Sequence, residues 1–255
     1  MPRDTWLILK RELTLRLRNP LWIAIDVTHP LLYVFLFGPL MKKFVQHTPG
    51  FPAGSMWMIF TPAMMMQAAI TTASFVGMSL LADYRAGVLE RLRVSPIRPT
   101  SLLLGKVLAV ALNVIALSGV ILLATVGVFG LRPAALGVLI SMLIVALFTI
   151  TLASCSYAIA LRLKHEQFVS ALINAVMLPL LLLSGSLVPI TTTLAPNWLY
   201  TLSRMNPASY IMDAGRASFR GDLHMATIGQ GLAVLLIVTL LSLWWGARTL
   251  NRDLA

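Results

Sequence analysis

The chain has 255 residues, of which 58% are hydrophobic and only 11% charged, and its mean hydropathy is +0.85. Charged residues reach about 25% in soluble domains, so this composition excludes an ordinary soluble globular protein. The formal charge of +11 indicates basic residues gathered at membrane edges, where anionic lipid attracts them, rather than a nucleic-acid partner. Because the apolar runs are continuous instead of alternating, we expect membrane-spanning helices and not a β-barrel.

The first predicted element is an amphipathic helix over residues 4–18 that lies in the membrane interface. The segment is too short and too charged to cross a bilayer. One helical face carries its apolar side chains, Trp6, Leu9, Leu13 and Leu17. Basic side chains occupy the remainder, Lys10, Arg11, Arg16 and Arg18. A simple basic flank ahead of the first span is the alternative interpretation.

The first predicted span covers residues 21–41 and contains the ionisable residues Asp26 and His29, followed by Pro30. No removable signal peptide precedes it, so we expect an uncleaved anchor. Asp26 and His29 are three residues apart and share a helical face. Ionisable groups within spans usually face the protein interior. The pair is therefore a candidate for a substrate or proton contact, for a structural polar contact at a helix or subunit interface, or for a site near the cytoplasmic membrane edge.

Five later apolar runs each have about the 20 residues needed to cross roughly 30 Å of hydrocarbon. They cover residues 56–82, 102–129, 134–161, 168–188 and 227–246. The second span is rich in methionine, which indicates either an adaptable apolar surface or ordinary filling of the core. Asn113 and Asn174 add polar groups to the third and fifth spans and are candidates for a pathway or an interface.

The loop at residues 83–101 is the longest charged segment between spans. The stretch from Asp83 to Lys106, which includes this loop and the start of the next span, holds two acids, Asp83 and Glu90, and five basic residues, Arg85, Arg91, Arg93, Arg98 and Lys106. Such a basic excess is typical of cytoplasmic loops. Val88, Leu89 and Leu92 predict the apolar side of a short helix whose charged side faces a soluble partner. A solvated loop without a partner is the alternative.

The basic residues also predict the topology. Fourteen of the 20 Lys and Arg residues fall on one side if the chain spans six times with both termini in the cytoplasm, and six fall on the other side. The segment 189–225 then lies outside the cell. Its prolines and polar residues argue against a seventh span, and its apolar stretches favour external re-entrant helices near the exit of a pathway.

Catalytic motifs are missing from the sequence. Gly105 and Lys106 lack the earlier glycine and the following Ser or Thr of a phosphate-binding loop. The four histidines are scattered, and the single cysteine, Cys155, has no partner in the chain, so we expect no metal site and no intrachain disulfide. We therefore predict no enzyme active site in this chain.

Three motifs in order along the chain resemble the type-two ATP-binding-cassette (ABC) exporter permeases. The first is Gly87 to Pro96, GVLERLRVSP, followed by Leu102 to Lys106, LLLGK. The second runs from Leu183-Ser184-Gly185 to Pro189. The third is NPASY at Asn206 to Tyr210, with Asp213 and Arg216 behind it. Together they cover almost the whole chain, which looks most similar to the bacterial multidrug and antibiotic-resistance branch.

The resemblance implies an all-α integral membrane protein forming a single transmembrane domain over residues 1–255. It would sit in the bacterial inner membrane, dimerise with a second permease subunit, and be driven by a separate ATPase subunit that binds ATP and Mg²⁺. The interface helix and a coupling helix in the loop 83–101 would dock on that ATPase. Positions carried over for this coupling are Arg11, Arg85, Glu90, Arg91 and Arg93. The external re-entrant motif would comprise Asn206, Pro207, Tyr210, Asp213 and Arg216.

These implications predict efflux of an amphipathic drug or a lipid-like compound. Two alternatives remain open from the sequence. One is export of a polysaccharide or a lipid-linked glycan, and the other is a membrane scaffold or sensor that recruits a soluble factor without transporting anything.

Overall fold

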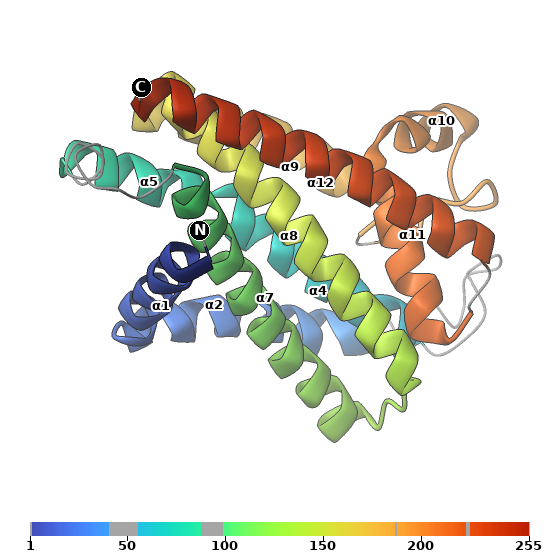
Figure 1. Cartoon of the computed structure of the whole chain (residues 1–255). Coiled ribbons are helices and arrows are strands. Elements are labelled where there is room, and N and C mark those ends of the chain that lie inside the picture. The colour runs from blue at the N-terminus through green and yellow to red at the C-terminus, as the bar shows by residue number, and fades with distance from the viewer. Residues whose placement is uncertain (1, 41–55, 88–98, 187, 223–224, 255) are drawn as a thin grey trace.

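The computed structural model describes residues 2–40, 56–87, 99–186, 188–222 and 225–254, and these residues form a helical bundle (Figure 1). Long apolar stretches form helices because every backbone N–H and C=O is then satisfied within the segment. In chain order the helices are α1 (Pro2–Leu17), α2 (Pro20–Leu32), η1 (Tyr33–Phe37), α4 (Met56–Ser74), α5 (Val76–Arg85), α7 (Pro99–Phe129), α8 (Ala135–Leu163), α9 (Glu166–Leu183), α10 (Asn197–Met205), α11 (Pro207–Arg220) and α12 (Met225–Leu254).

Six helical segments of the described chain are long and apolar enough to cross a membrane, which confirms the predicted number of spans. They are Ile23–Leu40, Met56–Arg85, Pro99–Phe129, Ala135–Leu163, Glu166–Leu183 and Ala226–Arg252. Both chain ends lie at the end of the bundle where α5 finishes and α7 begins (Figure 1). We call this end the proximal end. The distal end carries the turn between α7 and α8, together with α10 and α11.

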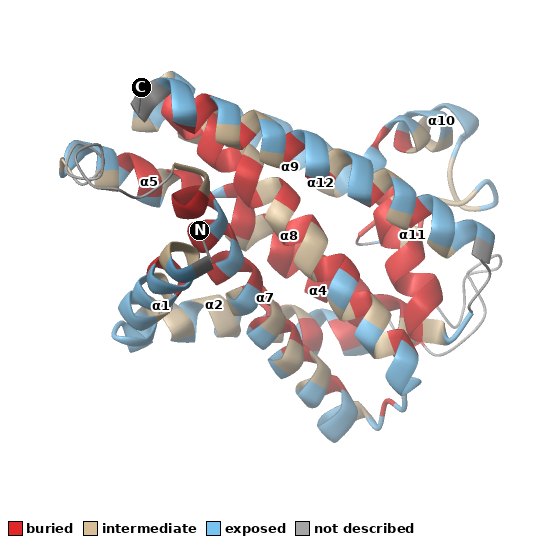
Figure 2. Cartoon of the chain, viewed as in Figure 1, coloured by how far each residue is buried: buried red, intermediate tan, exposed pale blue. Residues whose placement is uncertain are grey.

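The core lies around α4, which packs against α7, α8 and α11. In an apolar 18-residue stretch of the second span, 72% of the residues are buried within the chain, and the methionines fill the interior, with Met64, Met65 and Met66 almost fully enclosed. The methionine-rich stretch is therefore core. In contrast, only 11% of the fifth span is buried, and much of α9 and α12 faces outward (Figure 2).

The predicted apolar face of the interface helix is divided between two environments. In α1, Ile8 and Leu9 are buried against the protein, whereas Trp6 and Leu17 are exposed. α1 packs along α7, and it does so at Gly105.

Two spans depart from the regular helices that the sequence predicts. The first contains Pro30 and then one π-helical segment, η1, before it continues to Leu40. The second is divided at Phe75 into α4 and α5. At this break the hydroxyl of Ser156 in α8 donates to the carbonyl of Ser74 at 2.5 Å and accepts from the N–H of Gly77 at 2.9 Å. The side chain of a neighbouring helix thus replaces hydrogen bonds that a continuous helix would make itself.

Candidate functional site

Lys106 is the centre of a buried ionic cluster at the proximal end. Its Nζ lies 2.6 Å from Oδ2 of Asp83 and 3.0 Å from Oε1 of Glu12, and only 4% of its side chain is exposed. The three residues belong to α7, α5 and α1. A buried ammonium is tolerated only when it is paired, so the two carboxylates hold the interface helix, the end of the second span and the start of the third span together.

Gly105 explains how α1 can come close enough for this cluster to form. A Cβ atom at Gly105 would lie 2.7 Å from the Cβ of Ile8 and 3.0 Å from the carbonyl oxygen of Thr5. Ordinary carbon contacts need about 3.5–4.0 Å. Gly105 and Lys106 therefore both fix the position of α1. Gly105 leaves room for α1 to pack closely against α7, and Lys106 binds the carboxylate of Glu12 on α1.

Further contacts join the remaining helices of the proximal end. Nη1 of Arg85, in α5, lies 2.9 Å from Oε1 of Glu166 in α9, in an exposed ion pair. The guanidinium of Arg162 lies over the ring of Trp245, 5.6 Å from its centroid. These contacts bring the ends of α5, α8, α9 and α12 into one surface.

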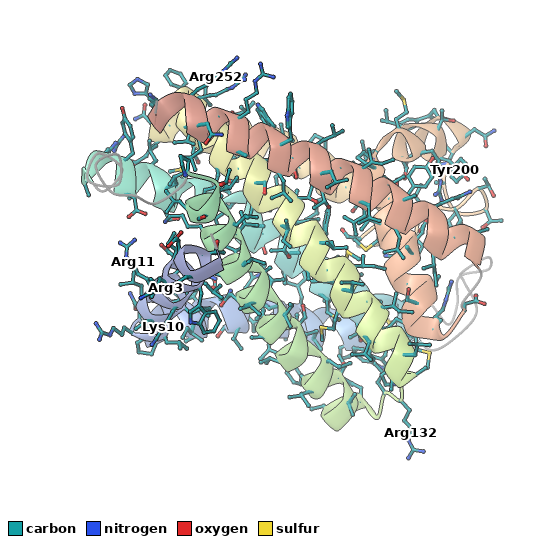
Figure 3. All side chains as sticks on the ribbon, in the orientation of Figure 1. Arg3, Lys10, Arg11, Arg132, Tyr200 and Arg252 are labelled. Atoms are coloured by element: carbon teal, nitrogen blue, oxygen red, sulfur yellow. The ribbon has the colours of Figure 1, made fainter. Side chains whose placement is uncertain are left out.

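Two of the five predicted coupling residues lie at the proximal end of the bundle. Arg85 is one, and Arg11 is the other, with its Nη1 3.8 Å from Oε1 of Glu12. Glu90, Arg91 and Arg93 lie outside the described residues. Figure 3 shows Arg3, Lys10, Arg11 and Arg252 at the proximal end, with Arg132 and Tyr200 far from them. Of the labelled basic residues, the four that the sequence assigns to one side thus lie at one end of the bundle, and Arg132, which it assigns to the other side, lies at the opposite end.

Arg216 is the centre of a second buried cluster, at the distal end. It belongs to α11 and donates from Nη2 to the carbonyl oxygens of Gly185 at 2.5 Å and Ser186 at 3.1 Å. Gly185 has a positive φ of 71°, which turns the chain after α9 and which glycine adopts without strain. Among the described residues, Nε and Nη1 of Arg216 have no hydrogen-bond partner.

The other residues of the predicted re-entrant motif gather around the same turn. Oδ1 of Asn206 caps α11 by accepting from the N–H of Ala208 at 3.0 Å, and its Nδ2 donates to the carbonyl of Leu180 at 3.1 Å. Pro207 is the first residue of α11, a position where its missing N–H has no cost.

Arg204 completes this distal cluster. Its Nη1 lies 2.9 Å from Oδ2 of Asp213, and its guanidinium lies 5.0 Å and 5.4 Å from the ring centroids of Tyr200 and Tyr210. The motif named from the sequence therefore forms one connected polar assembly between α9, α10 and α11. Arg204 was not among the predicted site residues.

The four candidate pathway or interface residues lie on three helices with separate surroundings. Oδ2 of Asp26 lies 3.9 Å from Nη2 of Arg16, whereas the ring of His29 lies 5.2 Å from that of Tyr33. Asn174, in α9, is exposed and donates to the carbonyl of Ser170 within its own helix at 2.9 Å. Nδ2 of Asn113, in α7, is buried without a hydrogen-bond partner in the described part of the chain.

Asp26 also lines a cavity that the sequence does not reveal. The cavity has a volume of about 670 Å³, is open on one side, and is lined by residues of α1, α2, α4, α5, α7 and α8. Its charged lining residues are Glu12, Arg16, Asp26 and Lys106. Of these, only Asp26 was predicted as a site residue. For Glu12 and Lys106 the sequence signal is that an acid in the first helix and a lysine inside a span both need a partner, and Arg16 was predicted only as part of the basic face of the interface helix.

The fold and the two clusters define a polytopic helical membrane protein whose proximal end gathers charged helix termini. The ABC-2 type transporter family model matches residues 3–219, so the chain belongs to this family. The resemblance seen in the sequence motifs is thereby confirmed.

Three relatives show how similar the chain is to known proteins and over how much of its length. The Cyanophora paradoxa chain named transport permease ycf38 is 26% identical, over 93% of this chain and 86% of the relative. The daunorubicin resistance ABC transporter permease protein DrrB1 of Streptomyces coeruleorubidus is also 26% identical, over 80% and 69%. The Escherichia coli chain named multidrug ABC transporter permease YbhR is 23% identical, over 72% of this chain and 49% of the relative.

Proposed function

We propose that the chain is the membrane-spanning permease subunit of an ABC exporter that moves an amphipathic drug or lipid-like compound outward. The family match over residues 3–219 is the observation that carries this proposal. Two of the relatives bear names that connect them with drug resistance, DrrB1 and YbhR, and this favours an amphipathic substrate over a glycan.

The energy source in this proposal is a separate ATPase subunit that binds ATP and Mg²⁺. The sequence lacks a phosphate-binding loop of its own, so the chain has to receive motion through contacts with a partner. The proximal end suits such contacts, because α1, α5 and α7 meet there on Lys106. A force applied to α1 or to the loop after α5 would reach the third span directly.

The proposed arrangement places both termini and the loop 83–101 in the cytoplasm of a bacterial cell, with the chain crossing the inner membrane and paired with a second permease subunit. Two ATPase subunits that close around nucleotide would then alter the packing between the two permeases. A ligand or partner shifts such an equilibrium only by its differential contact with the two states.

Reconstitution tests the transport activity. The chain is purified with an ABC ATPase that co-purifies with it from its own host and inserted into proteoliposomes, and the ATP-dependent movement of a fluorescent amphiphile is measured together with ATP hydrolysis. We expect transport that stops when the ATPase cannot hydrolyse ATP. Hydrolysis that no amphiphile or lipid alters, without movement of any compound, would favour the scaffold or sensor instead.

Charge reversal tests the docking surface. The triple variant Glu90→Arg, Arg91→Glu and Arg93→Glu is expected to abolish co-purification of the ATPase while the chain still inserts into the membrane. Arg132→Glu, at the opposite end of the bundle, is the control and should retain the partner. Undiminished co-purification of the triple variant would remove the docking assignment.

A further inference from the structure

The cavity beside the Lys106 cluster has two chemically different walls. One is charged, with Arg16 from α1 and Asp26 from α2, and the other is apolar, with Phe75, Met78 and Val110 from α4–α5 and α7. Its volume of about 670 Å³ is within the range of roughly 300–1,000 Å³ that is usual for small-molecule sites. A cavity of this kind matches an amphipathic ligand with a charged head and an apolar chain.

The charged groups of this wall differ in how well they are paired. Lys106 has two carboxylates at hydrogen-bond distance, so its charge is fully compensated. Arg16 and Asp26 lie 3.9 Å apart, which is too far for a hydrogen bond, although charged pairs usually approach to about 2.7–2.9 Å. In addition, Nη1 of Arg16 is buried and has no hydrogen-bond partner within the described residues.

The unpaired donor on Arg16 has an energetic consequence. A buried charged group without a hydrogen bond is unfavourable, and neighbouring Asp26 does not supply that bond at its present distance. Nη1 of Arg16 is itself buried, but both side chains are about one-third exposed, so part of each is accessible to a ligand. The two opposite charges, next to each other but not hydrogen-bonded, fit a ligand group that carries both signs of charge.

We propose that this cavity binds a zwitterionic phospholipid with a primary ammonium, of the phosphatidylethanolamine type. The phosphate accepts hydrogen bonds from the guanidinium of Arg16, whose planar fork matches phosphate oxygens. The ammonium donates to the carboxylate of Asp26. One acyl chain lies along the apolar wall, where it replaces water against Phe75 and Val110.

The charge balance around the cavity favours this zwitterion over an anionic lipid. Three carboxylates, those of Glu12, Asp26 and Asp83, stand against three cations, Arg11, Arg16 and Lys106. A zwitterion preserves this balance, whereas a lipid with net negative charge would leave one charge without a counterpart. A trimethylated ammonium would fit less well than a primary one because it has no N–H to donate to Asp26.

The lipid site is independent of the proposed transport activity. The residues that line the cavity all belong to this one chain. Lipid binding can therefore be measured in the absence of nucleotide, and its failure would leave the transport proposal untouched.

The experiment measures lipid retention by the purified full-length chain. Detergent-solubilised protein is mixed with phosphatidylethanolamine, phosphatidylcholine or phosphatidylglycerol of identical acyl chains, and bound lipid is counted by native mass spectrometry. We expect phosphatidylethanolamine to bind about tenfold more tightly than the other two, since one charge-assisted hydrogen bond corresponds to about that ratio. Equal retention of all three lipids, or preference for phosphatidylglycerol, would overturn the proposal.

Substitutions at the head-group wall separate the two charges. Asp26→Asn keeps the size of the side chain and is expected to remove the preference for phosphatidylethanolamine over phosphatidylcholine. Arg16→Gln is expected to weaken the binding of phosphatidylethanolamine and of phosphatidylcholine about tenfold each, because both lipids carry the phosphate. Arg18→Gln, an exposed charge close to Arg16, is the matched control and should change neither. A preference that survives Asp26→Asn contradicts the assignment of the ammonium.

Filling the cavity tests the acyl chain. Ala109→Phe projects a ring into the cavity, and retention of phosphatidylethanolamine should fall about tenfold or more. Ala116→Phe makes the same change on an exposed part of α7 and should have no effect. Soluble O-phosphoethanolamine is the last probe. If it competes at the concentration of the lipid, the head-group site stands but a membrane lipid is not its source.

Discussion

In the described part of the chain, each end of the bundle buries one basic residue, and the two ends compensate its charge in different ways. At the proximal end, Lys106 is bound by the carboxylates of Glu12 and Asp83, which belong to two other helices. At the distal end, Arg216 is bound by the carbonyl oxygens of Gly185 and Ser186, which belong to a turn. One cluster joins helices through side chains, and the other fixes a turn to a helix through its backbone.

The difference indicates how each end can respond to a force. Ion pairs between side chains can be exchanged for pairs with another partner or with water, so the helices at the proximal end can separate without unfolding. The distal turn can leave Arg216 only if buried carbonyls lose their donor, which costs about 1–3 kcal/mol for each group. We therefore expect motion to begin at the proximal end and the distal cluster to move as a unit.

Lys106→Met should have the largest effect on stability. The substitution removes the ammonium that binds both Glu12 and Asp83, and breaking a buried ion pair in this way typically costs about 3–5 kcal/mol. The measurement is unfolding by sodium dodecyl sulfate in mixed micelles. A triple variant that adds Glu12→Gln and Asp83→Asn should recover most of the loss. A single variant as stable as the parent chain would show that the cluster does not hold these helices.

Arg216→Gln should have the next largest effect, about 2–3 kcal/mol, because the shorter side chain no longer reaches the carbonyls of Gly185 and Ser186. Hydrogen exchange should then accelerate at residues 184–186 and at the start of α11. Arg220→Gln, one turn further along α11, is the control and should leave the exchange at this turn unchanged. Equal exchange in both variants would contradict the role of Arg216 as the anchor of the turn.

Gly105→Ala tests the close contact between α1 and α7. The added methyl group would clash with Ile8 and with the backbone at Thr5, so we expect a loss of about 1–3 kcal/mol, as is usual for overpacking. Gly119→Ala is the matched control on the same helix, where a Cβ would meet nothing within 4 Å. It should stabilise α7 by up to about 1 kcal/mol. If both variants have the same stability in the unfolding experiment, the packing of α1 on α7 does not depend on Gly105.

Arg85→Gln should have the smallest effect. The ion pair of Arg85 with Glu166 is about half exposed, and such pairs contribute about 0–1 kcal/mol. We expect the difference from the parent chain to disappear in 1 M salt, where the screening length falls to about 3 Å. A loss of stability that persists at high salt would mean that van der Waals packing of the Arg85 side chain, and not only its charge, contributes to the contact.

The number of spans could be predicted from the sequence because it depends on composition and on the length of apolar runs, which are local properties. The residues of the re-entrant motif were named from a resemblance, but their contacts were not. Asn206 reaches the carbonyl of Leu180, and Arg216 reaches residues about 30 positions earlier. The sequence contains no signal for which carbonyls they would meet.

The role of Lys106 could not be predicted for the same reason. The sequence shows a basic residue near the start of a span, but its partners are 23 and 94 residues away. The break at Phe75 has no proline, and Gly77 beside it does not by itself predict a break. The hydroxyl that bridges the two halves there belongs to Ser156, 81 residues further along the chain than Phe75.

The bend in the second span depends on Ser156, a residue of the fourth span. The angle between α4 and α5 is set by one oxygen atom that belongs to α8, so the two halves of the second span cannot tilt relative to each other without straining the fourth. A displacement of the segment that follows α5 would consequently be felt within α8 at Ser156, about two helical turns from the proximal end of that helix, and not only at the loop where it starts.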